Sequence, residues 1–200
     1  MDIQDLQQKL DKHKQWLETD GKEGERFSAF VANLSKANLI GANLNQTNLI
    51  GANLHKTNLI GANLIAANLF KANLSRANLY KANLTGANLS GANLSNANLM
   101  GAVLIEANLS GSNLSFANLR DANLSNANLK EADFFVANLC DATLKGADFS
   151  DTNFREANLE GSDFEGADLS SANLAEAKLD RANLCNATMP SKNIEDDCWD

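Results

Sequence analysis

Residues 32–51 read ANLSKANLIGANLNQTNLIG, and this stretch already contains the pattern that decides the fold. A small residue, an asparagine and a leucine recur every five positions, as in Ala32, Asn33 and Leu34. The register continues without insertion to Met189, which gives 32 repeats, 27 of them centred on leucine. A fixed period of this kind is typical of architectures in which each unit packs only on its neighbours.

A period of five fits neither a straight α-helix nor a flat β-strand. In an α-helix, successive leucines would lie roughly 140° apart and would spiral around the whole surface. In a flat strand, an odd step would send alternate leucines to opposite faces. All leucines are buried if the chain turns a corner once per repeat, with the small residue and the leucine inside and the asparagine outside. Gly41, Gly51 and Gly61 at the fifth position suit a corner with positive φ.

The repeats resemble the A(D/N)LXX consensus of the pentapeptide-repeat family over residues 32–191. This resemblance implies an all-β solenoid, a right-handed quadrilateral β-helix in which four repeats close one coil of 20 residues. The 32 repeats then make about eight coils. At about 4.8 Å per coil, the rod would be roughly 38 Å long.

The sequence predicts three segments. Residues 1–31 form a capping segment whose helix runs from about Ile3 to Glu18, with Phe27, Phe30 and Val31 completing an apolar plug on the first coil. Residues 32–191 form the β-helix, and residues 192–200 form an acidic tail that discourages edge-to-edge pairing. Within the helix, a single histidine without a partner motif is expected to pack in the cap.

Two roles are open for the asparagine that precedes each leucine. Its side chain can accept hydrogen bonds from the corner backbone, which is the favoured interpretation, or it can form amide ladders on a solvated surface. Among the cysteines, Cys140 and Cys185 are too far apart in a coil register to form a disulfide, and only Cys185 with Cys198 could pair.

Outward positions 20 residues apart should form columns along the rod. One column is apolar over four coils, and a second opens with two apolar residues. A contiguous exposed apolar stripe often marks an interface. The alternative is that these residues merely favour extended backbone pairing. The candidate interaction surface comprises Ile40, Ile60, Tyr80, Met100, Ile50 and Phe70.

Charge is segregated along the chain, although the overall net charge is −8. Residues 32–115 carry a net charge of +4, and residues 116–191 carry a net charge of −7. Several carboxylates would stack 20 residues apart, where solvent and salt, or a cation or basic partner, must offset their repulsion. The candidate acidic surface comprises Asp121, Asp141, Glu131 and Asp151.

These observations favour a non-enzymatic protein that acts as a rigid protein–protein interaction scaffold. We expect no catalytic residues, no cofactor and no bound metal, because no nucleophile–base, metal-ligand or phosphate-loop motif occurs. The acidic balance argues against direct binding of nucleic acid, and no apolar run suits a membrane span or a secretory signal, so the expected compartment is the cytoplasm. The family resemblance offers an alternative, a DNA mimic that binds DNA gyrase or topoisomerase, and also a homodimer formed through the last coils.

Overall fold

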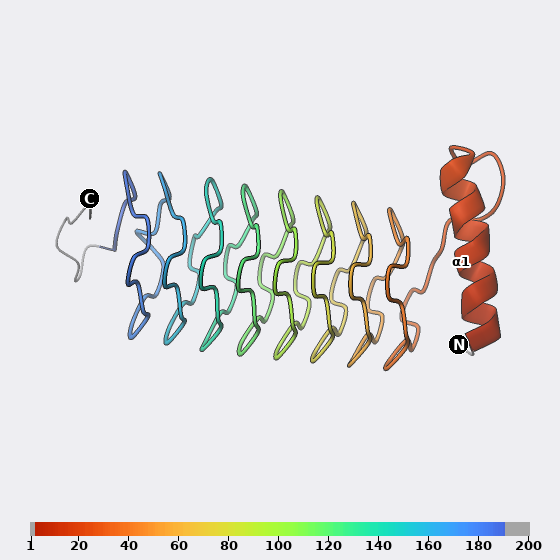
Figure 1. Ribbon diagram of the computed structural model, residues 1–200, viewed down its shortest axis with the longest axis horizontal. Coiled ribbons are helices and arrows are strands. Elements are labelled where there is room, and N and C mark those ends of the chain that lie inside the picture. The colour runs from red at the N-terminus through yellow and green to blue at the C-terminus, as the bar shows by residue number, and fades with distance from the viewer. Residues whose placement is uncertain (1–2, 191–200) are drawn as a thin grey trace.

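The computed structural model describes residues 3–190 and shows one helix followed by a stack of coils (Figure 1). Helix α1 (Ile3–Glu18) lies across one end of the stack, as predicted. Parallel β-bridges join each residue that precedes a core leucine to its counterpart 20 residues later, as in Asn33–Asn53. One coil therefore takes 20 residues. The predicted acidic tail, residues 192–200, lies outside the described residues.

The corner of each repeat depends on a left-handed backbone at its fifth residue. Every fifth position from Lys36 to Asn186 except Ser171 has a φ between 53° and 70°. Most of these residues are not glycine, although the left-handed region costs an ordinary residue about 1–2 kcal/mol. Two backbone hydrogen bonds hold each corner: Lys56 N–H donates to the next coil at 3.0 Å, and Thr57 N–H closes the turn onto Leu54 at 3.0 Å.

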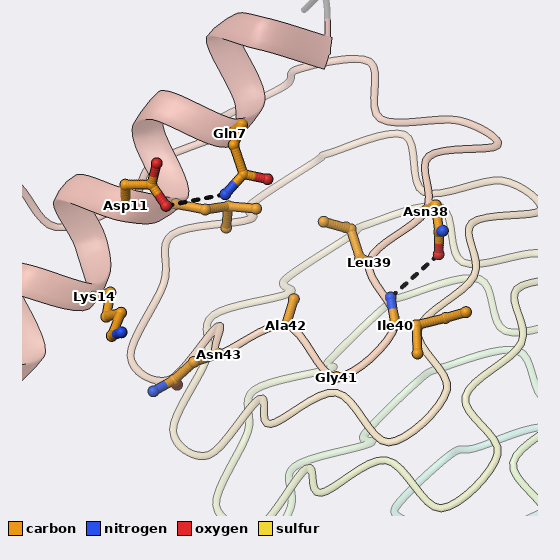
Figure 2. Close-up of a pocket in the computed structure, with 10 residues that line it drawn as sticks. Gln7, Asp11, Lys14, Asn38, Leu39, Ile40, Gly41, Ala42 and Asn43 are labelled. Carbon is orange, nitrogen blue, oxygen red and sulfur yellow. Dashed lines mark hydrogen bonds between the residues drawn. The ribbon is translucent and has the colours of Figure 1, made fainter.

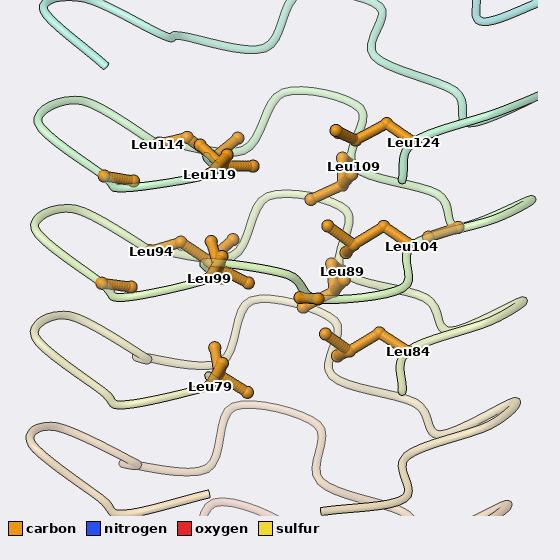
Figure 3. Packing of buried hydrophobic residues seen from close by; sticks show 14 of the residues in the cluster. Leu79, Leu84, Leu89, Leu94, Leu99, Leu104, Leu109, Leu114, Leu119 and Leu124 are labelled. Carbon is orange, nitrogen blue, oxygen red and sulfur yellow. The ribbon is translucent and has the colours of Figure 1, made fainter. Parts of the chain in front are cut away.

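The core is a continuous stack of leucines with alanines between them. Figure 3 shows Leu79, Leu99 and Leu119 following one another up the interior, and each of them is fully buried. Burying a leucine side chain contributes about 1.5–3 kcal/mol. Threonine replaces alanine without an unpaired hydroxyl, since the buried Thr57 donates to the Leu34 carbonyl at 2.8 Å.

The coil-to-coil pairing has one break. Bridges join the equivalent residues of every neighbouring coil in the described part of the rod except Asp148 and Asp168. Here Ser171 leaves the left-handed region, and its hydroxyl accepts the Asp151 N–H at 3.0 Å in place of the usual carbonyl. The bulky Phe149 adjoins the break and packs in a cluster of four core phenylalanines. A larger core side chain and two like charges on the same side therefore coincide with this opening.

The asparagine side chains perform both of the roles that the sequence left open. Asn98 Oδ1 accepts the Met100 N–H at 3.3 Å, which supports the corner. Its Nδ2 donates to Asn78 Oδ1 in the preceding coil at 3.0 Å, and its Oδ1 accepts from Asn118 at 3.5 Å. The corner bond recurs around the rod, whereas the amide ladder occurs along only part of it.

Helix α1 covers the first coil with its apolar side. Leu6 and Leu10 pack against the core, and His13 is fully buried. Nδ1 of His13 accepts the Phe27 N–H at 3.1 Å, and Trp16 stacks on the imidazole with ring centroids 5.8 Å apart. The single histidine is therefore part of the cap packing, as predicted.

The corner geometry begins one repeat earlier than the sequence analysis placed it. Ala29 is buried as a repeat centre, and its N–H donates to Asn48 in the next coil at 2.8 Å. Phe27 is buried in the plug as expected, but Phe30 and Val31 are 63% and 64% exposed. The prediction for these two residues was wrong because they occupy a corner, where Val31 has a φ of 52°.

The two roles of the asparagine can be separated by changing Asn98. Asn98→Asp keeps an acceptor for the Met100 N–H but loses the donor to Asn78, so we expect it to lower the free energy of unfolding by about 0.5–1.5 kcal/mol. Asn98→Ala loses both bonds and should cost more. Urea denaturation followed by circular dichroism measures both. Asn108→Asp is the matched control, because the hydrogen bond of the Asn108 side chain is the corner bond to Ser110. Equal destabilisation at the two sites would contradict the ladder's role.

The cap should loosen in mild acid because of His13. Burial lowers the pKa of His13 from its usual value of 6.5, despite an opposing effect of the Asn45 carbonyl. A lowered folded pKa means that the folded state binds fewer protons, so stability is full above pH 6.5 and falls as the pH decreases toward the folded pKa. Hydrogen exchange of the α1 amides should therefore accelerate from pH 7 to about pH 5 beyond the intrinsic rate change. His13→Gln should abolish this excess; an excess that persists in the variant would assign it to another group.

Candidate interaction surfaces

The two turn residues of each repeat form four straight corners along the rod. We name them corner A (residues 35–36 and every 20 thereafter), corner B (40–41), corner C (45–46) and corner D (30–31). Side chains at equivalent positions stack directly, since the Lys71 side chain would contact a Cβ at Gly91 at 3.4 Å. Corners B and D lie two sides apart, on opposite edges of the coil. The corners therefore convert a 20-residue period into separate surfaces.

Corner B carries the first predicted apolar column. Ile40, Ile60, Tyr80 and Met100 occupy successive coils, and Ile40 is 54% exposed while the other three are half-buried. Lys81 places its ammonium 5.2 Å from the centroid of the Tyr80 ring. The structure thus brings these four candidate residues together in one ladder.

Corner D carries the second column, which is longer than the sequence analysis proposed. Ile50 is half-buried and Phe70 is 36% exposed, with the Lys71 ammonium 5.1 Å from the Phe70 ring centroid. The exposed Phe30 and Val31 extend this column by one coil. Counting back five residues from the first predicted centre would have revealed them. Because corners B and D are opposite, the six candidate residues form two surfaces and not one.

A pocket of about 350 Å³ adjoins the start of corner B, between α1 and the first coil (Figure 2). Gln7, Asp11 and Lys14 of α1 line one side, and Ile40 lies on the other. Gln7 Nε2 donates to Asp11 Oδ1 at 2.9 Å, so part of the polar lining is internally paired. The pocket gives the Ile40 end of the column a polar border.

The predicted acidic residues are divided between opposite corners and are paired. At corner B, Arg120 lies between Asp121 and Asp141, with N–O distances of 3.5 and 3.3 Å. At corner D, Glu131 stacks on the coil of Asp151, and the Lys130 ammonium lies 3.8 Å from the Glu131 carboxylate. Neighbouring cations of the same chain therefore offset part of the like-charge repulsion.

Corner A carries an exposed apolar patch that the sequence analysis missed. Phe116 and Val136 are 53% and 37% exposed at fifth positions in adjacent coils. Phe135 meets Phe116 edge to face at a centroid distance of 5.6 Å, and the Arg155 guanidinium lies 5.6 Å from the Phe135 centroid. The available signal was the presence of bulky residues at corner positions where glycine or asparagine is favoured.

The groups with chemical potential do not form a catalytic arrangement. His55 Nδ1 lies 2.8 Å from Ser75 Oγ, a contact across one coil that the sequence did not predict. The Ser75 hydroxyl donates to Asn73 Oδ1 at 2.6 Å, so the imidazole donates to the serine oxygen and is not placed as its base. No group of three or more histidine, cysteine or acidic side chains suited to a metal ion occurs among residues 3–190.

The Cys140 thiol lies on corner B beside an acidic residue. Burial, and then the hydrogen bond to Asp141, raise the pKa of Cys140, which disfavours a reactive thiolate. The alternative disulfide between Cys185 and Cys198 involves a residue outside the described part of the chain. In that described part, no helix is long and apolar enough to cross a lipid bilayer.

Comparison with known proteins agrees with this geometry. The family model of pentapeptide repeats matches eight copies, which together span residues 32–134 and 137–190. No match was found among curated protein sequences.

Several solved structures resemble the chain. HetL from Nostoc sp. strain PCC 7120, a pentapeptide-repeat protein involved in heterocyst differentiation regulation, is 31% identical over 91% of this chain and 97% of its own, with a TM-score of 0.42. The protein alr5209 of Nostoc PCC 7120 is 33% identical over 54% of this chain and 77% of its own, with a TM-score of 0.34. QnrB1, a plasmid-mediated fluoroquinolone resistance protein, is 18% identical over 84% and 92%, with a TM-score of 0.49. With family-model matches over most of its length and a coil of 20 residues, the chain belongs to the pentapeptide-repeat family and folds as a right-handed quadrilateral β-helix.

Proposed function

We propose that this protein is a non-enzymatic, rigid scaffold that binds another protein through its apolar corner columns. The observation that carries this proposal is the ladder of Ile40, Ile60, Tyr80 and Met100 on corner B. These side chains stack without interruption on the outside of a rod whose core is already filled. Their exposure therefore adds nothing to the interior and supplies a surface that a partner can bury.

The scaffold is suited to this role by its rigidity. Each coil is hydrogen-bonded to the next on all four sides except at the Asp148–Asp168 break, so the spacing between column residues is fixed. A partner that matches the 4.8 Å step loses little conformational entropy from this side of the interface. The two cations placed over Phe70 and Tyr80 border the apolar columns and favour a partner whose rim is acidic.

The alternative of a DNA mimic has less support from the surface. A mimic of duplex DNA needs a continuous acidic surface, whereas Asp121 and Asp141 share Arg120, and Glu131 and Asp151 lie on the opposite corner. The half of the rod nearest α1 is also basic. The fluoroquinolone resistance stated for QnrB1 is a property of that protein, whose identity to this chain is 18%.

The scaffold function can be tested by affinity capture from a lysate of the source cell. Ile60→Lys with Tyr80→Asp should reduce the recovery of a specific partner by about tenfold or more, because two apolar contacts at the centre of the column are lost. Ser90→Lys with Ser110→Asp, on corner D, is a matched control that should leave recovery unchanged.

Circular dichroism should show that both variants keep the wild-type fold. Recovery of the same partner by both variants would contradict a role for the corner B column. Inhibition of gyrase supercoiling by the purified wild type, lost when Asp121 and Asp141 are changed to lysine, would favour the mimic instead.

A further inference from the structure

Corner A differs from the other corners in the order of its fifth-position side chains. From α1 toward residue 190 this column carries three cations, one asparagine, two apolar residues and two carboxylates. The members are Lys36, Lys56, Arg76, Asn96, Phe116, Val136, Glu156 and Glu176. All of them except the half-buried Glu156 are exposed.

The three cations of this column have no acidic partner among the described residues of the same chain. The side chains of Lys36, Lys56 and Arg76 enter no ion pair in that range. They stand on consecutive coils, about 4.8 Å apart, where their mutual repulsion is not offset internally. Such a row attracts an opposed row of carboxylates with the same spacing.

The apolar centre of the column is costly for the isolated rod. Phe116 and Val136 have φ angles of 59° and 56°, a backbone region that is strained for aromatic and β-branched residues. Asparagine serves the same corner in the adjacent coil at Asn96, with a φ of 57°. Strained, solvent-exposed apolar residues contribute nothing to the core, so their placement points to a role at the surface.

We propose that corner A binds a second copy of this chain in an antiparallel, side-by-side dimer with its two-fold axis at Phe116. Arg76 and Glu156 lie 40 residues, or two coils, on either side of Phe116. Lys56 and Glu176 lie three coils on either side. An antiparallel copy centred on Phe116 therefore places Phe116 against Phe116, Arg76 against Glu156, and Lys56 against Glu176, each pair occurring twice.

The carboxylates of this corner can accept the additional cations. Arg155 approaches Glu156 at 2.9 Å and Glu176 at 3.7 Å, so one guanidinium serves two carboxylates and the cluster keeps a net charge of −1. The Glu176 side chain is exposed, and a carboxylate has about four acceptor sites. The straight corner is free of insertions, so no loop blocks the approach of a second rod.

This interface is independent of the proposed scaffold function, which uses corners B and D. A narrow ridge buries less area than a standard interface, so we expect a reversible dimer that weakens with added salt. Sedimentation equilibrium at micromolar to millimolar concentrations measures its Kd with the full chain.

Charge reversal gives a test with internal restoration. Lys56→Glu with Arg76→Glu should raise the Kd about tenfold or more, and Glu156→Lys with Glu176→Lys should do the same. An equimolar mixture of the two variants should dimerise like the wild type, since each end of the heterodimer again opposes unlike charges. Glutamate and lysine already occupy fifth positions elsewhere in the rod, so both variants should fold.

The matched control is Lys71→Glu with Lys81→Glu, which reverses two charges at fifth positions of corners D and B. This control should dimerise normally. Phe116→Asn should also weaken the dimer while keeping a residue suited to a positive φ.

Crosslinking tests the register. In a background without native cysteines, Ser115→Cys lies at the two-fold axis and should crosslink to its own copy with a short thiol reagent. Ser75→Cys lies two coils away, so its symmetry mates would be about 19 Å apart and should not crosslink.

Several outcomes would overturn the proposal. A wild type that stays monomeric at all concentrations would do so, and binding of polyglutamate by that monomer would assign the cations to an acidic partner. A dimer that is unchanged by both charge-reversal variants would also do so and would place the contact elsewhere, for example between the last coils.

Discussion

A left-handed corner follows each extended triplet of the rod, and the hydrogen bonds to the next coil make this strained conformation stable. A single corner such as Lys56, with a φ of 57°, is unfavourable in isolation. In the stack, its N–H donates to Ser75 of the next coil and the following Thr57 N–H closes the turn. The core leucines, the asparagine contacts and the straight surface columns all depend on this repeated pairing, because it sets the 20-residue coil.

Much of this architecture could be predicted from the sequence. The period of five required regular corners, and the spacing of Leu6, Leu10 and His13 predicted a cap helix that the structure places at Ile3–Glu18. Phe30 and Val31 were misplaced because apolar character suggested a plug, whereas the phase of the repeat, extended back by five residues, puts them at a corner. Local hydrophobicity was here a weaker guide than register.

The candidate surfaces were less accessible to sequence reasoning. A step of 20 residues assembled Ile40, Ile60 and Tyr80 correctly, because it requires only the coil length. The pairing of Arg120 with Asp121 and Asp141 depends on how adjacent turn residues direct their side chains, which no periodicity specifies. The meeting of Phe116 and Phe135 was missed for the same reason, since these residues belong to different positions of the repeat.

The absence of insertions between Leu34 and Met189 also restricts how the length of such a chain can change. Adding or removing one repeat of five residues would keep the core register but rotate everything beyond it by a quarter turn. The carboxylates of Glu156 and Glu176 would then leave the edge that carries Lys36 and Arg76. Only a change of 20 residues, one whole coil, keeps each surface residue on its edge. If these surface patterns matter to the organism, duplication and deletion in genes for rods of this kind should be tolerated mainly in units of 60 base pairs, although the fold itself would accept 15.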